Sequence, residues 1–270
     1  MDIFRQFLFG EEFLMTDIFS GVDEYSVCAD TLPEAYHKAL SILASQQDIY
    51  PCDDWNTTQK EVSMTMTVRE PLKEPLISKL FIGGPRELEQ YRQEMLFGIL
   101  DFEVDRGNWA YTYHRRMEHQ IPFVISELKR NPSSRRAVIV IRDWEADAAS
   151  DDPACLQHIQ YFIRNGRLFC KVLFRSNDAC KATFMNAFAL IMLQQSIAAE
   201  LGVSMGSYVH RANSFHCYEK DFAMLSGYRK RIEEAQDLYD ICFDYKDDWE
   251  ELMDMYKGEI ADMVRELKNR

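Results

Sequence analysis

The sequence predicts an α+β fold, because segments typical of helices and strands are mixed along the chain without strict alternation. Two observations carry most of this prediction. The strand-like runs HIQYFIR and RLFCKVLFR flank Asn165-Gly166, a dipeptide typical of a tight hairpin turn. Residues 181–201 have the length and apolarity of a central buried helix, and Gly202 follows as a helix stop.

The first half of the chain adds two helices and a strand. Residues 33–47 carry apolar side chains at helical spacing, which predicts a helix with one buried face. Residues 61–68 alternate between apolar and polar side chains, as a half-buried strand does. Pro85 is placed to open a further helix at about residues 86–97.

The second half adds strands around the hairpin and helices after it. Residues 136–142, RAVIVIR, are typical of a strand that is buried on both faces. Residues 208–218 predict a strand that runs into a polar loop. The last forty residues, rich in charge with aromatics at helical spacing, predict two amphipathic surface helices.

Composition narrows the class of protein. The chain has 270 residues, 47% of them hydrophobic, so it can bury a substantial core. Its formal net charge of −13 argues against non-specific binding of nucleic acid, because such binding needs clustered Lys and Arg side chains. The charge does not argue against binding of a small phosphorylated ligand. No apolar run suggests a membrane span, and Glu11, Glu12 and Asp17 interrupt the apolar N-terminus where a signal peptide needs continuity. We therefore expect a soluble cytoplasmic protein.

The seven cysteines form no CxxC pair and no Cys/His cluster with zinc spacing, so no metal site is expected. Most of them are expected to be buried free thiols of a reducing compartment. Cys155 lies in the turn-prone segment DDPACLQ. A lone cysteine is more often a buried thiol than a nucleophile, and it becomes reactive only where cations stabilise its thiolate. Arg135-Arg136 and Arg175-Ser176 supply candidate groups for such a site and for a phosphate.

These residues fall into a series of motifs. In order along the chain stand Arg135-Arg136, Pro-Ala-Cys ending at Cys155, RSND at 175–178, Asn186, and HCY at 216–218. This series resembles the thymidylate synthase and pyrimidine nucleotide hydroxymethylase superfamily, most closely its shorter archaeal and phage-type members. The resemblance covers roughly residues 30–222 and is strongest in the second half. It implies a mixed β-sheet packed with helices, one face of which forms a homodimer interface.

The resemblance also implies roles for the residues at the nucleotide. Cys155 would add to C6 of the pyrimidine and turn C5 into a nucleophile. Arg175 and Ser176 would hold the 5′-phosphate, with Arg175 close enough to favour the thiolate. Asn186 would bind the O4/N3 edge of the base, and an amide there favours dUMP over a cytosine nucleotide.

Further roles follow from the same resemblance. His216 and Tyr218 would hydrogen-bond the sugar 3′-hydroxyl, and Asp178 would receive the pterin ring of 5,10-methylenetetrahydrofolate or of a related reduced pterin. Arg135 and Arg136 would reach the phosphate bound by the neighbouring subunit.

The general acid/base and one phosphate ligand are less clearly marked. Glu94, in YRQEMLFG, is the preferred carboxylate, and Tyr113 is preferred over Tyr111 as the tyrosine that the family pattern calls for. Arg69 is the candidate for a further phosphate ligand from the first half of the chain.

The chain departs from the family pattern at Leu156, where most members have histidine, and at Asn213-Ser214 before the HCY motif. Three functions stay open: methylation of dUMP to dTMP, hydroxymethylation of a pyrimidine nucleotide, and nucleotide binding without catalysis. We expect residues 1–222 to form the catalytic domain and residues 223–270 to form an acidic helical extension packed on it.

Overall fold

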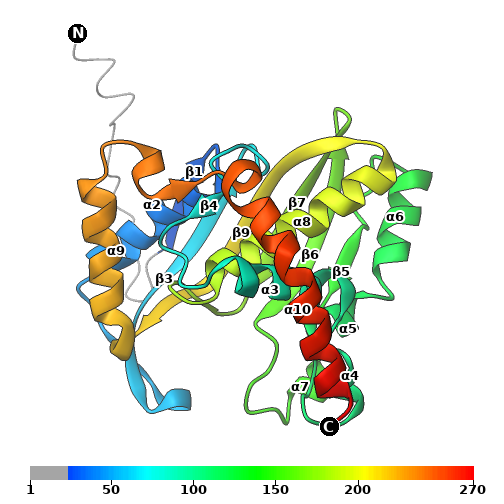
Figure 1. The fold of residues 1–270 in the computed structure, drawn as a ribbon, viewed down its shortest axis with the longest axis horizontal. Helices are drawn as coiled ribbons and strands as arrows, with labels where there is room; N and C mark the ends of the chain where they lie inside the picture. The colour runs from blue at the N-terminus through cyan, green and yellow to red at the C-terminus, as the bar shows by residue number, and fades with distance from the viewer. Residues whose placement is uncertain (1–23) are drawn as a thin grey trace.

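The computed structural model describes residues 24–270, so the expectation built on Glu11, Glu12 and Asp17 lies outside the described residues. A mixed sheet forms the centre of the protein (Figure 1). Its strands lie in the order β1 (Glu24–Ala29), β3 (Thr57–Val68), β9 (Ser204–Tyr218), β7 (Arg167–Phe174), β6 (Leu156–Arg164) and β5 (Val138–Val140). Two short strands extend it: β2 (Tyr50–Cys52) pairs with β3, and β8 (Asn177–Asp178) pairs with β9. Parallel and antiparallel pairs both occur, as an α+β fold predicts.

Helices cover one face of this sheet. The long helix α8 (Thr183–Leu201) packs on β7 and β9, α2 (Leu32–Ser45) on β1 and β3, and α6 (Ile121–Arg130) on β5 and β6. The strand side chains beneath them are buried, among them Met66, Ile139, Ile159, Val172 and His210. The opposite face carries Val140, Phe162, Leu173 and Val209, which are exposed or half-buried. Within residues 24–270, this second face is therefore left partly uncovered.

The β6–β7 hairpin is confirmed. Asn165 and Gly166 both have positive φ, 50° and 71°, as a two-residue turn of the tightest type requires. The turn fixes the register as far as His158, and an irregularity between Leu156 and His158 then shifts it by one residue, so that Leu156, the first residue of β6, lies opposite Phe174, the last of β7. The two chain segments that leave the hairpin at this end, before Leu156 and after Phe174, must therefore lie side by side.

The helices expected at 33–47 and 86–97 are confirmed as α2 and α3 (Pro85–Phe97), and the central helix is α8, closed by Gly202 with a φ of 66°. By length and composition α8 is apolar enough to cross a membrane, which the sequence analysis did not anticipate. However, 67% of its apolar window is buried inside the protein, as befits a core helix.

Two expectations about strands were wrong. The strand expected at 136–142 is only β5, and Val140 is 52% exposed because β5 lies at the sheet edge with a single face covered. The polar loop expected within 208–218 is absent from the described chain. β9 continues to Tyr218 because β3 and β8 pair with it from both sides.

The C-terminal part packs on the same body. Helix α9 (Phe222–Glu234) lies on α2, β10 (Cys242–Phe243) pairs with β4 (Ile77–Ser78), and a π-helical turn (Tyr245–Trp249) leads into α10 (Glu250–Lys268). Helix α10 crosses α3 and ends beside the short helix α4 (Phe102–Asp105), as Figure 1 shows. Arg86 pairs with Glu259 at 2.6 Å, and Arg106 donates to the carbonyl oxygen of Leu267 at 2.8 Å. Two surface helices were expected here, although α9 begins before the last forty residues.

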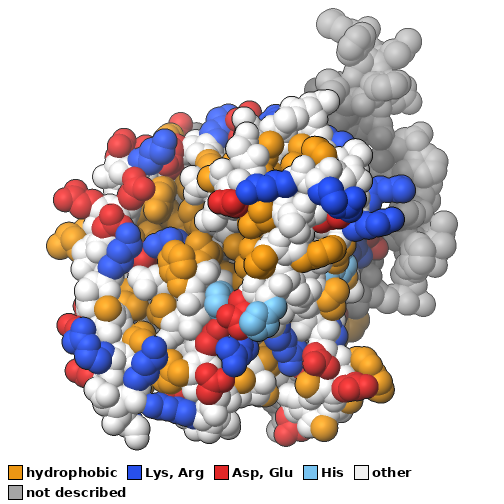
Figure 2. Space-filling model, turned by 90° about the vertical axis from the view of Figure 1, so that its right-hand side faces the viewer, with side chains coloured by type: hydrophobic (Ala, Val, Ile, Leu, Met, Phe, Trp, Pro, Cys, Tyr) orange, Lys and Arg blue, Asp and Glu red, His pale blue; other side chains and the backbone are white. Residues whose placement is uncertain are grey.

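Three single-turn elements and two short helices complete the described chain. They are the 3-10 turns Asp53–Trp55, Glu219–Asp221 and Leu238–Asp240, and helices α5 (Tyr113–Met117) and α7 (Trp144–Asp147). Figure 2 shows the face at the β5 end of the molecule, where hydrophobic patches interrupt a surface of mixed charge.

Candidate active site

A cavity of about 580 Å³ opens where the hairpin strands, β9 and the start of α8 converge. Most of the residues singled out from the sequence line it. They are Tyr113, Cys155, Arg175, Ser176, Asp178, Asn186, His216 and Tyr218. Elements that are far apart in the sequence thus meet in a single cavity.

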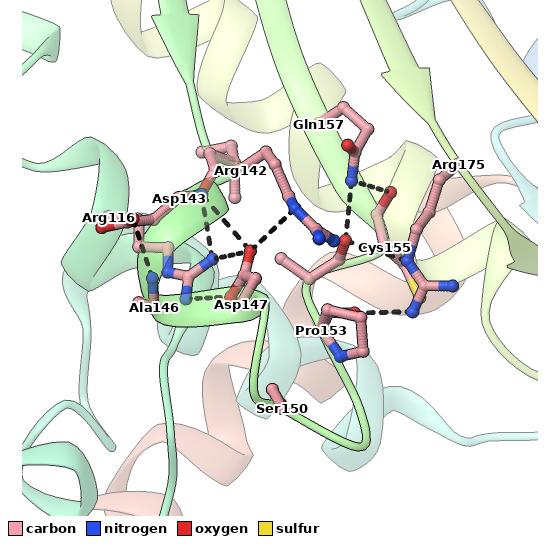
Figure 3. Close-up of polar contacts among 12 residues, drawn as sticks. Arg116, Arg142, Asp143, Ala146, Asp147, Ser150, Pro153, Cys155, Gln157 and Arg175 are labelled. Carbon is pink, nitrogen blue, oxygen red and sulfur yellow. Dashed lines mark hydrogen bonds and ion pairs between the residues drawn. The ribbon is translucent and has the colours of Figure 1, made fainter.

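The hairpin brings Cys155 and Arg175 together. Cys155 stands just before β6 and Arg175 just after β7, and the Arg175 backbone N–H donates to the Cys155 carbonyl oxygen at 2.8 Å. The Arg175 guanidinium also holds the loop, since Nη2 donates to the Pro153 carbonyl oxygen at 2.6 Å and Nε to that of Ala154 at 3.2 Å (Figure 3). The arginine therefore fixes the backbone that carries the thiol.

Opposing electrostatic effects act on the pKa of the Cys155 thiol. Burial raises the pKa of the Cys155 thiol, the Arg175 guanidinium lowers that pKa, and the Asp152 carboxylate raises it. A thiolate is the reactive form of cysteine, and a nearby cation is the usual means of producing it. Arg175 is the cation that this cavity places beside the sulfur.

Asn186 lies in the first turn of α8 and is only 5% exposed. The Tyr91 hydroxyl, from α3, donates to Asn186 Oδ1. Among the described residues, no side chain or backbone group hydrogen-bonds Asn186 Nδ2. A buried amide of this kind can donate and accept at the same time, so it can bind the polar edge of a flat ligand.

His216 and Tyr218 are among the last residues of the strand β9, and His216 lies beside Ser176. Their rings pack edge to face with centroids 4.8 Å apart. Burial lowers the pKa of His216, so its imidazole is neutral at pH 7. Its Nδ1 lies 3.3 Å from the Ser214 carbonyl oxygen, which can only accept, and this favours the tautomer with a proton on Nδ1. Nε2 is then an acceptor for a hydroxyl group.

The segment of RSND is held by a buried hydrogen-bond network. Asn177 Oδ1 accepts from Thr183 Oγ1 and from His210 Nε2, each at 2.9 Å, and His210 Nδ1 contacts the Tyr208 hydroxyl at 2.9 Å. Asp178 Oδ1 accepts from the backbone N–H groups of Cys180 and Lys181, at 2.9 and 2.8 Å, and so caps the turn before α8.

A second, more apolar cavity of about 400 Å³ adjoins the first, because Tyr113, Ser150 and Asp152 line both. Its remaining walls are largely aromatic and aliphatic: Tyr91, Met95, Leu100, Trp109 and Tyr111. Glu94 lines this second cavity rather than the first, and burial raises the pKa of its carboxyl group. Tyr113 lines both cavities, and its hydroxyl oxygen accepts a hydrogen bond at 3.4 Å from the backbone N–H of Leu156, the residue after Cys155.

Three of the predicted arginines lie outside the Cys155 cavity of their own chain. Arg135 and Arg136 are exposed beside β5, and no ion pair to either is found among residues 24–270. Arg69 pairs with Asp30 at 2.6 Å and is not among the residues that line either cavity, so the structure gives no support to its assignment as a phosphate ligand.

Beside the second cavity lies a cluster of side chains of the types that bind metal ions. Asp101, His114 and Glu118 offer ligand atoms within 4.8 Å of one another. These atoms already have partners, because His114 Nδ1 lies 2.7 Å from Asp101 Oδ2 and Glu118 pairs with Arg115 at 3.3 Å. Gly98, with a φ of 59°, is required here, since a Cβ would collide with both His114 and Asp101.

Several residues of the site were not predicted from the sequence. Tyr91 lies one helical turn before Glu94 and shares its inward face, so helical spacing pointed to it. Asp152 stands within DDPACLQ but was not assigned a role. The β2–β3 hairpin adds Cys52, Trp55 and Gln59 to the cavity, and no local sequence signal marks them.

Comparison with known proteins identifies relatives over most of the chain. A family model described as "Thymidylate synthase" matches residues 89–261. A protein of Methanothermobacter thermautotrophicus named "Putative thymidylate synthase" is 38% identical over 217 residues, which are 73% of this chain and 95% of the relative. "Thymidylate synthase 1" of Bacillus subtilis is 26% identical over 225 residues, 76% of this chain and 79% of the relative.

A solved structure has the same fold. The thermostable thymidylate synthase A of Bacillus subtilis superposes with a TM-score of 0.59 and 18% identity, covering 80% of this chain and 96% of that one.

Proposed function

The chain belongs to the thymidylate synthase family, and on that premise we propose that it methylates dUMP at C5 to give dTMP. The observation that carries the proposal is the single cavity in which Cys155 meets Arg175, Ser176, Asn186, His216 and Tyr218. These groups match the parts of a pyrimidine nucleotide: a nucleophile for the ring, a cation and a hydroxyl for the phosphate, an amide for the base edge, and an imidazole and a phenol for the sugar.

In this proposal Cys155 begins the reaction. Its thiolate attacks C6 of the uracil ring, a C–S bond forms, and the electron pair of the C5–C6 double bond moves toward C5 and O4. Arg175 contributes twice, because it lowers the pKa of the thiol and holds the Pro153–Ala154 backbone that positions the sulfur. Ser176 and Arg175 bind the 5′-phosphate, for which a guanidinium with a neighbouring hydroxyl is well suited.

Asn186 is proposed to select the base, and His216 with Tyr218 to bind the sugar. The amide of Asn186 donates to O4 of uracil and accepts from N3–H. The neutral His216 accepts a hydrogen bond from the 3′-hydroxyl through Nε2. Burial and neighbouring acidic groups raise the pKa of Tyr218 to about 12, so its phenol stays protonated and can donate to the same hydroxyl.

The second cavity fits the pterin of 5,10-methylenetetrahydrofolate. A flat, mostly apolar ring needs aromatic walls, and Trp109, Tyr111 and Tyr113 provide them next to the Cys155 cavity. When bound there, this group would supply the methylene carbon and the hydride that become the methyl group. Glu94, whose raised pKa keeps a proton available nearer neutral pH, is the proposed general acid/base, and Asp178 the proposed polar contact to the pterin.

Hydroxymethylation is the alternative outcome, in which water intercepts the transferred carbon. It uses the same nucleotide-binding groups and would differ in how well water is excluded. The aromatic lining of the second cavity favours exclusion of water and hence the methyl product.

We further propose a cytoplasmic homodimer. The open sheet face presents Val140, Leu173 and Val209 for a second copy, and the exposed Arg135 and Arg136 would reach that copy's phosphate. Residues 1–222 would be the catalytic domain and residues 223–270 an extension, although the family match itself runs on to residue 261. Mixing inactive Cys155→Ser and Arg136→Gln chains tests the shared site: partial activity should return in mixed dimers, and its absence would contradict a phosphate contact from the partner.

The decisive experiment uses 5-fluoro-dUMP with methylenetetrahydrofolate. We expect a covalent adduct on Cys155 by mass spectrometry, and none with Cys155→Ser or Cys155→Ala. The absence of an adduct on the unsubstituted protein would overturn both proposed reactions, methylation and hydroxymethylation, and leave nucleotide binding without catalysis. The mass of the product from dUMP then separates a methyl from a hydroxymethyl group.

A further inference from the structure

Tyr91 stands between the two cavities, beside the Asn186 amide that is proposed to bind the base edge. It projects from α3, which packs on α8, and its hydroxyl donates to Oδ1 of Asn186. Tyr91 lines the second cavity and Asn186 lines the first, so their contact forms part of the wall between them. Among the described residues Asn186 Oδ1 is the partner of the Tyr91 hydroxyl, and Glu94 instead accepts from Gln90 at 2.8 Å.

The direction of this hydrogen bond has a chemical consequence. Burial raises the pKa of Tyr91 well above its ordinary value, so the phenol keeps its proton and acts as a donor. An asparagine amide can take two orientations that exchange oxygen and nitrogen. A donor at Tyr91 stabilises the orientation with Oδ1 toward α3. The Asn186 NH₂ group is then left to donate to the ligand, while Oδ1 keeps a second lone pair.

This fixed orientation separates uracil from cytosine. Uracil presents an acceptor at O4 and a donor at N3–H, which match the NH₂ group and the remaining lone pair. Cytosine presents an amino donor at C4 and an acceptor at N3, the reverse pattern. To bind cytosine, Asn186 has to turn its NH₂ group toward Tyr91, and the buried hydroxyl proton then loses its acceptor. Leaving such a donor unsatisfied is costly enough to change affinity about tenfold.

We propose that Tyr91 is a positioning residue that fixes the Asn186 amide and thereby makes the site selective for uracil over cytosine nucleotides. This inference rests on the proposed function, because it requires that Asn186 contacts the base. Tyr91 acts through Asn186 and does not itself touch the nucleotide. The quantity to measure is the ratio of the affinities for the two nucleotides, because a mere loss of packing would not change that ratio.

The test compares dUMP and dCMP binding by calorimetry, together with kcat/KM for both nucleotides, in the unsubstituted protein and in Tyr91→Phe. We expect the dUMP-to-dCMP ratio to fall about tenfold in Tyr91→Phe. Tyr161→Phe is the matched control, since it removes a different buried tyrosine hydroxyl, which lies outside both cavities. Its ratio should equal that of the unsubstituted protein. An unchanged ratio in Tyr91→Phe, with dUMP still bound, overturns this inference alone.

A double-mutant cycle tests the route through Asn186. In an Asn186→Ala background, Tyr91→Phe should no longer change the ratio, because the amide it positions is gone. A tenfold change that persists there would show that Tyr91 acts on the base directly and would overturn the positioning role. If the unsubstituted protein binds neither nucleotide, the proposed function fails and this inference with it. Thermal melting of each variant separates loss of fold from loss of selectivity.

Discussion

The Arg175 guanidinium donates to the carbonyl oxygen of Pro153 at 2.6 Å, and so ties the end of β7 to the loop that carries Cys155. The same guanidinium lowers the pKa of the Cys155 thiol against the effect of burial. One side chain therefore serves two purposes, one geometric and one electrostatic. They can be separated, because lysine keeps the charge while lacking the planar group that reaches two carbonyls.

Arg175→Met removes both contributions and should raise the pKa of Cys155. Alkylation of Cys155 by iodoacetamide at pH 7.5 should slow severalfold, since below the pKa the thiolate fraction falls as the pKa rises. Arg175→Lys should keep most of the alkylation rate yet form the 5-fluoro-dUMP adduct much more slowly, because the loop is no longer held. Equal alkylation rates in Arg175→Met and the unsubstituted protein would contradict the electrostatic role.

Asp152→Asn should act in the opposite direction. The Asp152 carboxylate raises the pKa of Cys155, so its neutralisation lowers that pKa and speeds alkylation about twofold at neutral pH. The effect should be small and should shrink with added salt, because the carboxylate is exposed and solvent screens it. Asp151→Asn is the matched control, since Asp151 lines the same cavity but does not perturb the thiol. A slower reaction in Asp152→Asn would refute this assignment.

The sequence predicted the main elements because their signals are local. The hairpin turn at Asn165-Gly166 sets the register of β6 and β7 as far as His158. An irregularity between Leu156 and His158 then shifts the pairing by one residue, and Cys155 lies beside Arg175. Tyr91 could not be predicted in the same way, because its contact with Asn186 joins residues 95 positions apart through the packing of α3 on α8. Helical spacing marked its face but not its partner.

The errors at the strands have the same origin. The apolar run around β5 suggested two covered faces, but coverage depends on neighbours, and the single chain leaves the Val140 side open. The polar residues Asn213 and Ser214 suggested a loop, yet β9 stays extended because it has strands on both sides to pair with. In each case tertiary pairing decided what local composition could not.

Asn177→Ala should destabilise the fold beneath the site. The substitution removes the acceptor of His210 Nε2–H, which is buried, whereas Thr183 Oγ1 keeps its second acceptor at the Asp178 carbonyl oxygen. An unsatisfied buried donor costs about 1–3 kcal/mol, so urea unfolding should show a loss of about 2 kcal/mol. Asn213→Ala, at an exposed position of β9, should change the free energy of unfolding by less than about 0.5 kcal/mol. Similar losses in both variants would mean that the network is not a stabilising element.

His37 gives the fold a pH dependence that is independent of the site. The ring is 3% exposed between α2 and β4, where Nε2 lies 2.7 Å from the Ser78 hydroxyl. Burial, with a smaller contribution from Arg231, lowers the pKa of His37 to about 3, against about 6.5 in the unfolded chain. Between these values the unfolded chain binds a proton that the folded chain excludes, so stability is present above pH 6.5 and falls as the pH drops below it.

The size of that fall can be measured in a variant that keeps the hydrogen bond to Ser78. From pH 7 to pH 5.5 one such histidine costs about 1 kcal/mol of unfolding free energy. His210, whose pKa is also lowered to about 3 by burial, adds a similar amount. Urea unfolding at both pH values should therefore show that His37→Gln recovers about 1 kcal/mol of the loss, while His119→Gln, at a ring that is 86% exposed, recovers none. If His37→Gln lost as much stability as the unsubstituted protein, His37 would have to accept its proton without unfolding, and burial could not be what keeps it neutral.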